Sequence, residues 1–296
     1  MLPLTETSVE PLHSLRSLLA CLILVVIVLW TRPKDLFGQS VTEGRVWYFG
    51  LITAVSTGLG ALPFVFVSKP NRTMLGASNA VAAGMMMSAS FGLLVQGCGG
   101  IESVLGGWSS TQRTAGGSIV GLFFILGAKL ILEKHEDAMA FGNMSSLSAK
   151  KLVLVVFVMT LHSFSEGVGI GVSFAGNNDL GVFISLSLAV HNVPEGLAVA
   201  LVMIPRGVGV LDTALWAVFT SLPQPLMAVP AFRFVDHFEP LLPVGLGFAA
   251  GAMLVVAVVE LLPDAIKDTN PALVLSITAV SFGIMGMIQW EINGVI

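Results

Sequence analysis

Charged side chains are scarce in this chain of 296 residues: 14 Lys and Arg and 18 Asp and Glu make up 11% of it. A soluble globular chain has about 25% charged residues, whereas hydrophobic residues reach 55% here. These values exclude a soluble domain and a disordered chain, since both need far more polar surface. The net charge of −4, without a basic run, also excludes nucleic-acid binding. What remains is an integral membrane protein.

Cysteine is nearly absent as well. Cys21 and Cys98 each lie inside or beside an apolar stretch, and they form neither a disulfide framework nor a CxxC motif. The cysteines therefore say nothing about the cellular compartment.

Long apolar runs are what the sequence has in abundance. A helix needs roughly 20 mainly apolar residues to cross a hydrocarbon core of about 30 Å. Eight runs reach about that length: 46–68, 74–96, 114–132, 152–175, 180–204, 213–232, 241–263 and 271–290. The sequence thus predicts an all-α integral membrane protein with an eight-helix core over residues 43–292.

A ninth and shorter apolar stretch, 17–30, lies in the N-terminal segment 1–42. It is either an extra short helix or a signal sequence. Arg32, Lys34 and the lack of a small-residue cleavage site favour an uncleaved helix.

The loops predict an orientation when the extra helix is counted. Lysine and arginine are more frequent on the side of the N-terminus, called side A here, than on the opposite side B. The positive-inside rule makes side A cytosolic. The long loop 133–151 is then inside and the C-terminus outside.

Two apolar runs carry the same polar pattern, His-polar-x-x-Glu-Gly. It stands at 162–167 as HSFSEG and again, 29 residues later, at 191–196 as HNVPEG. In each copy His and Glu are four residues apart and share one helix face. His162 lies about 15 Å into its run at 1.5 Å per residue, near the mid-plane, and His191 is similarly deep.

The two motifs are centred symmetrically about the turn at 177–179, which predicts a central antiparallel hairpin with both motifs at one depth. A single buried His or Glu is usually a packing residue. Packing does not account for four such groups at one level, because burying each ionised group in the membrane costs at least about 2.5–3.5 kcal/mol.

A divalent transition metal accounts for two imidazoles and two carboxylates, since zinc binds both types of ligand. Binding also neutralises the carboxylates. Pro194 frees the carbonyl of Val190 within the second motif. Small residues at Gly167, Gly171 and Gly196 are typical of helices that approach closely.

With these motifs the chain resembles the ZIP metal transporters, in the branch of bacterial-type, GufA-like members. Runs 79–91 (NAVAAGMMMSASF) and 247–265 (GFAAGAMLVVAVVELLPDA) are similar to the second and seventh core helices of that family. The resemblance covers about residues 43–292 and implies movement of zinc, or of Fe²⁺, Mn²⁺ or Cd²⁺, towards the cytosol. The metal is the transported substrate, and no cofactor is expected.

The resemblance also implies roles for individual residues. The transport-site ligands would be His162, Glu166, His191 and Glu195, with the adjacent polar ligands Ser163 and Asn192. Met86, or a neighbour among Met85–Met87, matches a soft ligand, although methionines in such a helix are often packing residues. Glu260 matches an acidic residue on the path to one membrane face, although an acidic residue at a helix end is as often simply solvated.

One position departs from the family pattern. Many relatives have an acidic residue before a proline in the sixth core helix, where this chain has Gln224 between Pro223 and Pro225. Glutamine offers an oxygen but no charge. We therefore expect one dominant metal site, with any second site weak or absent.

Two other functions stay open at this stage. The same ligands could hold zinc in an intramembrane hydrolase, but both glutamates are needed as ligands and no HExxH or GxSxG motif is present. A membrane protein that binds metal without transporting it is the other alternative. The expected partners are a divalent metal ion and the lipid bilayer, and the sequence leaves a homodimer open.

Overall fold

The computed structural model describes residues 10–34, 40–67, 71–99, 107–134, 146–176 and 178–294, and the regular elements in these ranges are all helical. Part of the long loop 133–151 thus lies outside the described residues. Following a first helix, the elements are α2 (Glu43–Thr57), η1 (Gly58–Ala61), α3 (Pro63–Phe66), α4 (Arg72–Cys98), α5 (Ser110–Lys134), α6 (Ser146–Gly176), α7 (Asn178–Met203), η3 (Ile204–Arg206), α8 (Val210–Ser221), α9 (Pro223–Arg233), α10 (Val235–Phe238), η4 (Glu239–Leu241), α11 (Leu242–Val255), η5 (Val256–Leu261), α12 (Leu262–Asp268) and α13 (Pro271–Gly294).

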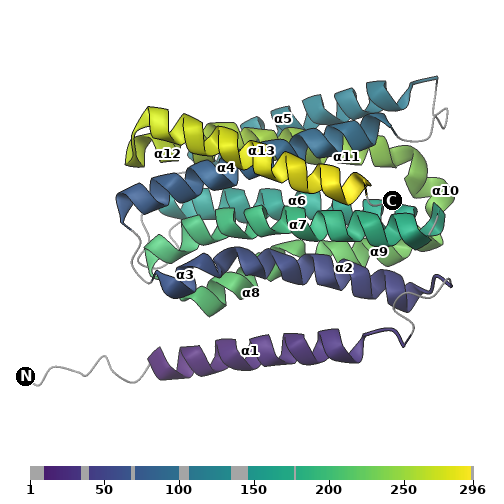
Figure 1. Ribbon diagram of the computed structural model, residues 1–296, viewed down its shortest axis with the longest axis horizontal. Coiled ribbons are helices and arrows are strands. Elements are labelled where there is room, and N and C mark those ends of the chain that lie inside the picture. The colour runs from purple at the N-terminus through teal and green to yellow at the C-terminus, as the bar shows by residue number, and fades with distance from the viewer. Residues whose placement is uncertain are drawn as a thin grey trace, which may run out of the picture.

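The eight predicted spans are confirmed within the described part of the chain. Eight helical segments are long and apolar enough to cross a membrane, and they lie roughly parallel in one bundle (Figure 1). The protein is therefore a multi-pass, all-α integral membrane protein.

The first helix, α1 (Glu10–Trp30), is longer than the predicted stretch 17–30. The apolar count missed its first two turns because they are polar, with Glu10 and Pro11 in a favourable position to begin a helix. Helix α1 contacts α8 and α2 and runs along one edge of the bundle (Figure 1).

Three spans are interrupted where the sequence predicts continuous helices. The first changes to a 3₁₀ segment at Gly58 and the sixth breaks at Leu222, ahead of Pro223. Proline cannot donate the backbone hydrogen bond that would continue the helix. The seventh contains the π-helical segment η5, and single π turns are frequent at functional sites.

Helices α6 and α7 lie between two groups of helices. The first group is α2 and α9, which pack against α6 and α7, and the second group is α4, α5, α11 and α13, which pack together. Helix α6 also contacts α11, while α7 also contacts α4 and α13. The predicted central hairpin thus touches both groups, so side chains from either one can reach it.

Candidate metal site

Helix α6 contributes the first set of site residues. Glu166 is 1% exposed and Ser163 is fully buried. The Ser163 hydroxyl donates to the carbonyl of Met159 at 2.8 Å, as serine commonly does inside a helix. His162 lies on α6, but its side chain is outside the part that the structure describes.

Helix α7 contributes the second set. His191, Asn192 and Glu195 are all at least 98% buried. The helix continues through Pro194 without a break. His191 and Glu195 therefore keep the one-turn spacing that the sequence predicts.

Gln224 of α9 joins the two sets. Its Nε2 donates to Glu166 Oε2 at 2.5 Å, and its Oε1 accepts from Asn192 Nδ2 at 3.0 Å. Asn192 Nδ2 also donates to the carbonyl of Thr53 in α2, at 2.6 Å. A carboxamide has a donor and an acceptor end, and Gln224 uses both. The polar residue that departs from the family pattern is thus fully buried between the two motifs.

Glycines bring the flanking helices this close. A Cβ at Gly167 would lie 2.6 Å from the carbonyl oxygen of Gln224, and one at Gly196 would overlap the carbonyl oxygen of Thr57. A Cβ at Gly171 would likewise overlap the carbonyl of Ala228. The predicted close approach at these glycines is confirmed, and it places the α2 and α9 backbones against the central hairpin.

A cavity of about 550 Å³ reaches this network from one end of the bundle. It extends along α6 from the exposed Gly176 past Ser173 and Gly169 to Glu166. Glu239 and Gln96 also line it. The end of α6 at Gly176 faces side B in the predicted orientation, so Glu166 is approached from that side.

The metal ligands themselves remain predictions. Among the described side chains, no group of three His, Cys, Asp or Glu could hold a metal ion. That search does not include the His162 side chain. Met86 is fully buried on α4, whereas Met85 and Met87 are partly exposed, so Met86 is the methionine enclosed by the core.

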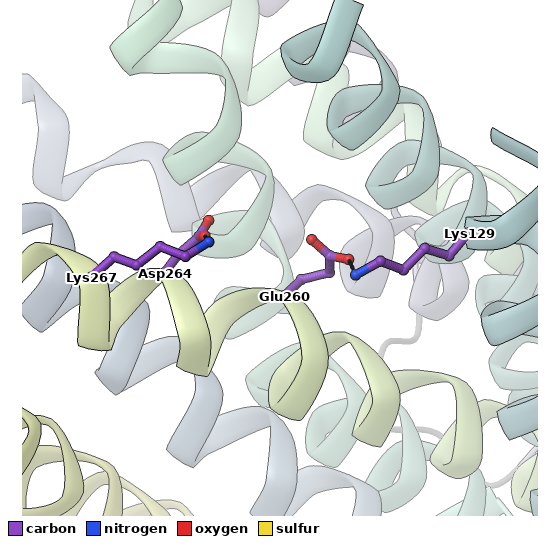
Figure 2. A network of polar contacts seen from close by, with 4 residues as sticks. All are labelled: Lys129, Glu260, Asp264 and Lys267. Carbon is purple, nitrogen blue, oxygen red and sulfur yellow. Dashed lines mark hydrogen bonds and ion pairs between the residues drawn. The ribbon is translucent and has the colours of Figure 1, made fainter. Parts of the chain in front are cut away.

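Glu260 lies on the π-helical segment η5, which packs against α4, α11 and α12. Its carboxylate makes an ion pair with Lys129 of α5 at 2.6 Å, and one turn later Asp264 pairs with Lys267 at 3.6 Å (Figure 2). The Glu260 side chain is 14% exposed. A positively charged partner already neutralises this residue in the structure, which the sequence did not predict.

A further polar residue at the site was missed from the sequence. Gln289 of α13 donates a hydrogen bond from its carboxamide nitrogen Nε2 to Nε2 of His191. The signal that could have found it is a lone amide in the apolar run 271–290. Its partner is 98 residues away along the chain, so no local spacing connects the two.

Comparisons with known proteins give a consistent result. A family model described as ZIP Zinc transporter matches residues 133–289. A putative zinc transporter of Arabidopsis thaliana is 44% identical over 249 residues, which are 83% of this chain and 39% of the plant protein. The zinc transporter GufA of Myxococcus xanthus is 34% identical over 72% of this chain and 85% of its own length. The zinc transporter ZIPB of Bordetella bronchiseptica is 29% identical over 71% of this chain and 69% of its own length. The chain thus spans about two fifths of the plant relative but most of the bacterial ones.

Proposed function

The chain belongs to the ZIP family of zinc transporters, and from this premise we propose that it carries Zn²⁺ across the membrane towards the cytosol. As a member of this family it is a membrane transporter and not an enzyme. Fe²⁺, Mn²⁺ and Cd²⁺ are further candidates for the cargo.

One observation carries the proposal. Two carboxylates, an imidazole and two amides are buried inside an apolar bundle, at Glu166, Glu195, His191, Asn192 and Gln224, and Gln224 hydrogen-bonds to residues of both motifs. Burying such groups in a membrane protein lowers its stability, and for that reason they usually mark a functional site. A divalent cation repays that cost because it neutralises both carboxylates and binds the neutral imidazole.

The proposed ligands are His162, Glu166, His191 and Glu195. Ser163, Asn192 and Met86 would complete the coordination as the cargo requires. Gln224 holds Glu166 and Asn192 in place, because both ends of its carboxamide are engaged with them. The Gln224 carboxamide is neutral, so it does not attract a second ion as a carboxylate would. This favours one dominant metal site.

The proposed direction is from side B to side A. The cavity that ends at Glu166 provides the approach from side B. Glu260 would receive the ion on its way out, in exchange for the Lys129 ammonium group. The excess of lysine and arginine on side A supports its assignment as the cytosolic side.

The experiment is uptake of radioactive zinc into lipid vesicles that contain the purified protein. His162→Ala and Glu195→Ala should each reduce the initial rate to near background while the protein remains inserted. His237→Ala and Glu291→Ala are matched controls, since both side chains are exposed, and they should transport normally.

Unchanged uptake in both site variants would refute the proposed ligands. Zinc binding without uptake by the unaltered protein would instead indicate a metal-binding protein that does not transport. Competition by Fe²⁺, Mn²⁺ and Cd²⁺ in the same assay then measures the metal preference.

A further inference from the structure

The contact between Gln289 and His191 assigns a role to a residue that the two sequence motifs do not include. We propose that Gln289 is a positioning residue, which orients the His191 imidazole and fixes the ring nitrogen that is presented to zinc. This inference rests on the proposed function, because it concerns a proposed ligand of the same site.

The contact comes from the opposite group of helices. Helix α13 packs against α4 (Figure 1) and also reaches α7. There Gln289 meets Nε2 of His191. The other glutamine of the site, Gln224, comes from α9. Gln224 thus contacts both motifs of the hairpin from one side of the bundle. Gln289 contacts the second motif from the other side.

Helix α4 provides the space for the Gln289 carboxamide. A Cβ at Gly92 would lie 2.9 Å from Oε1 and 3.2 Å from Nε2 of Gln289. These distances are shorter than nearly all real Cβ contacts, so any larger residue at 92 would push the carboxamide away. The carboxamide is therefore confined between Gly92 and His191. A long side chain loses conformational entropy when a contact orders it. This loss is smaller for Gln289 because its carboxamide is already confined.

Metal chemistry gives this hydrogen bond its importance. A histidine that binds metal through one ring nitrogen usually donates the N–H of the other to an oxygen, and that partner fixes the tautomer and the ring orientation. In the structure the carboxamide nitrogen of Gln289 faces Nε2 of His191 and donates to it. A half-turn of the carboxamide exchanges its nitrogen and oxygen, and in the zinc-bound protein Nε2–H of His191 would then donate to Oε1 of Gln289. Nδ1, which is buried, would then be the nitrogen that binds zinc. An amide can do this without adding a charge to the site.

The test compares zinc transport and zinc binding for Gln289→Leu, which keeps the bulk of the side chain and removes its oxygen. Loss of such a partner typically weakens metal affinity by about 10- to 100-fold. We expect the KM for zinc uptake and the Kd for zinc of the detergent-solubilised protein to rise within that range. The maximal rate should stay within about twofold of the unaltered protein.

Three further variants separate positioning from a structural role. Gln289→Glu keeps an acceptor oxygen and should restore most of the affinity. Met287→Leu is the matched control on the same helix, where an exposed side chain is replaced, and it should behave as the unaltered protein. In a His191→Ala background, Gln289→Leu should weaken zinc binding no further, because Gln289 acts through His191.

Several results would overturn the inference. These are an unchanged KM and Kd in Gln289→Leu, full additivity with His191→Ala, or a lower KM, which would mean that Gln289 blocks Nε2. If Gln289→Leu does not fold, Gly92→Ala displaces the same carboxamide without removing it and should raise the KM in the same direction. Normal affinity in Gly92→Ala would then refute the role. Failure of the proposed function is distinct, since the unaltered protein would then take up no zinc at all.

Discussion

Gln224→Glu is the substitution that tests most directly how many metal ions the site holds. In the structure Gln224 Nε2 donates to Glu166 Oε2 at 2.5 Å. The substitution replaces that donor with a second carboxylate oxygen. At a separation of about 3 Å and an effective dielectric constant of about 20, two such charges repel by about 5–6 kcal/mol.

In the metal-free variant, protonating one of the two carboxylates costs less free energy than this repulsion. A carboxyl group with an ordinary glutamate pKa of about 4.3 is protonated at pH 7 at a cost of about 3.7 kcal/mol. Because this is less than the repulsion, we expect the pair to hold one proton. The folded metal-free variant is then destabilised by about the cost of protonation, roughly 3.7 kcal/mol.

A second divalent cation removes this cost, because it binds both carboxylates in their ionised form. The metal content of the purified protein should rise from one zinc ion per chain to two, measured by mass spectrometry of the metal and by anomalous scattering. The midpoint of thermal unfolding should fall for metal-free Gln224→Glu and recover when zinc is added. Gln224→Met is the control, since it loses both hydrogen bonds without adding charge and should stay at one ion.

Two fully occupied ions in the unaltered protein would refute this reasoning. So would a single ion in Gln224→Glu together with an unchanged unfolding midpoint.

Three further predictions follow from the same structure. Initial uptake should fall as the pH on the uptake side decreases, since protons compete with zinc for the histidine and glutamate ligands, and a flat rate–pH profile would contradict this. Lys129→Met should lower the stability of the metal-free protein by about 1–3 kcal/mol because it leaves the largely buried Glu260 carboxylate without its charged partner. Adding Glu260→Gln should restore that stability in thermal unfolding, and no recovery would show that the ion pair is not the cause. Gly196→Ala should abolish the folded yield after size-exclusion chromatography because its Cβ overlaps the α2 backbone, whereas Gly283→Ala, with nothing within 4 Å, should be tolerated; equal yields would refute the packing argument.

The membrane spans could be predicted from the sequence because hydropathy is a local property. Each of the eight runs contains enough apolar residues to identify a span by itself. The interruptions were not predicted. Pro223 is a local signal that could have indicated the break in the sixth span, because proline ends helices, whereas no local signal marks the π turn at Val256–Leu261 in the seventh span.

The candidate site shows the same division. The i, i+4 spacing on α6 and α7 follows from helix geometry, and the glycines beside it predicted the close helix packing that the structure shows. The partners of these residues could not be predicted. Lys129 is 131 residues from Glu260, and Gln289 is 98 residues from His191, so only the folded bundle brings them together.

Charge balance explains why amides and not further acids complete this site. In their ionised form Glu166 and Glu195 would place two negative charges inside an apolar bundle, which a single Zn²⁺ would neutralise. A third carboxylate at position 224 would leave an excess negative charge unless a second cation or a proton were bound. Gln224 and Gln289 instead hold the surrounding groups through hydrogen bonds and leave the charge unchanged. We therefore expect the charge of the two motifs, and not the number of oxygen and nitrogen atoms around them, to determine how many ions the site binds.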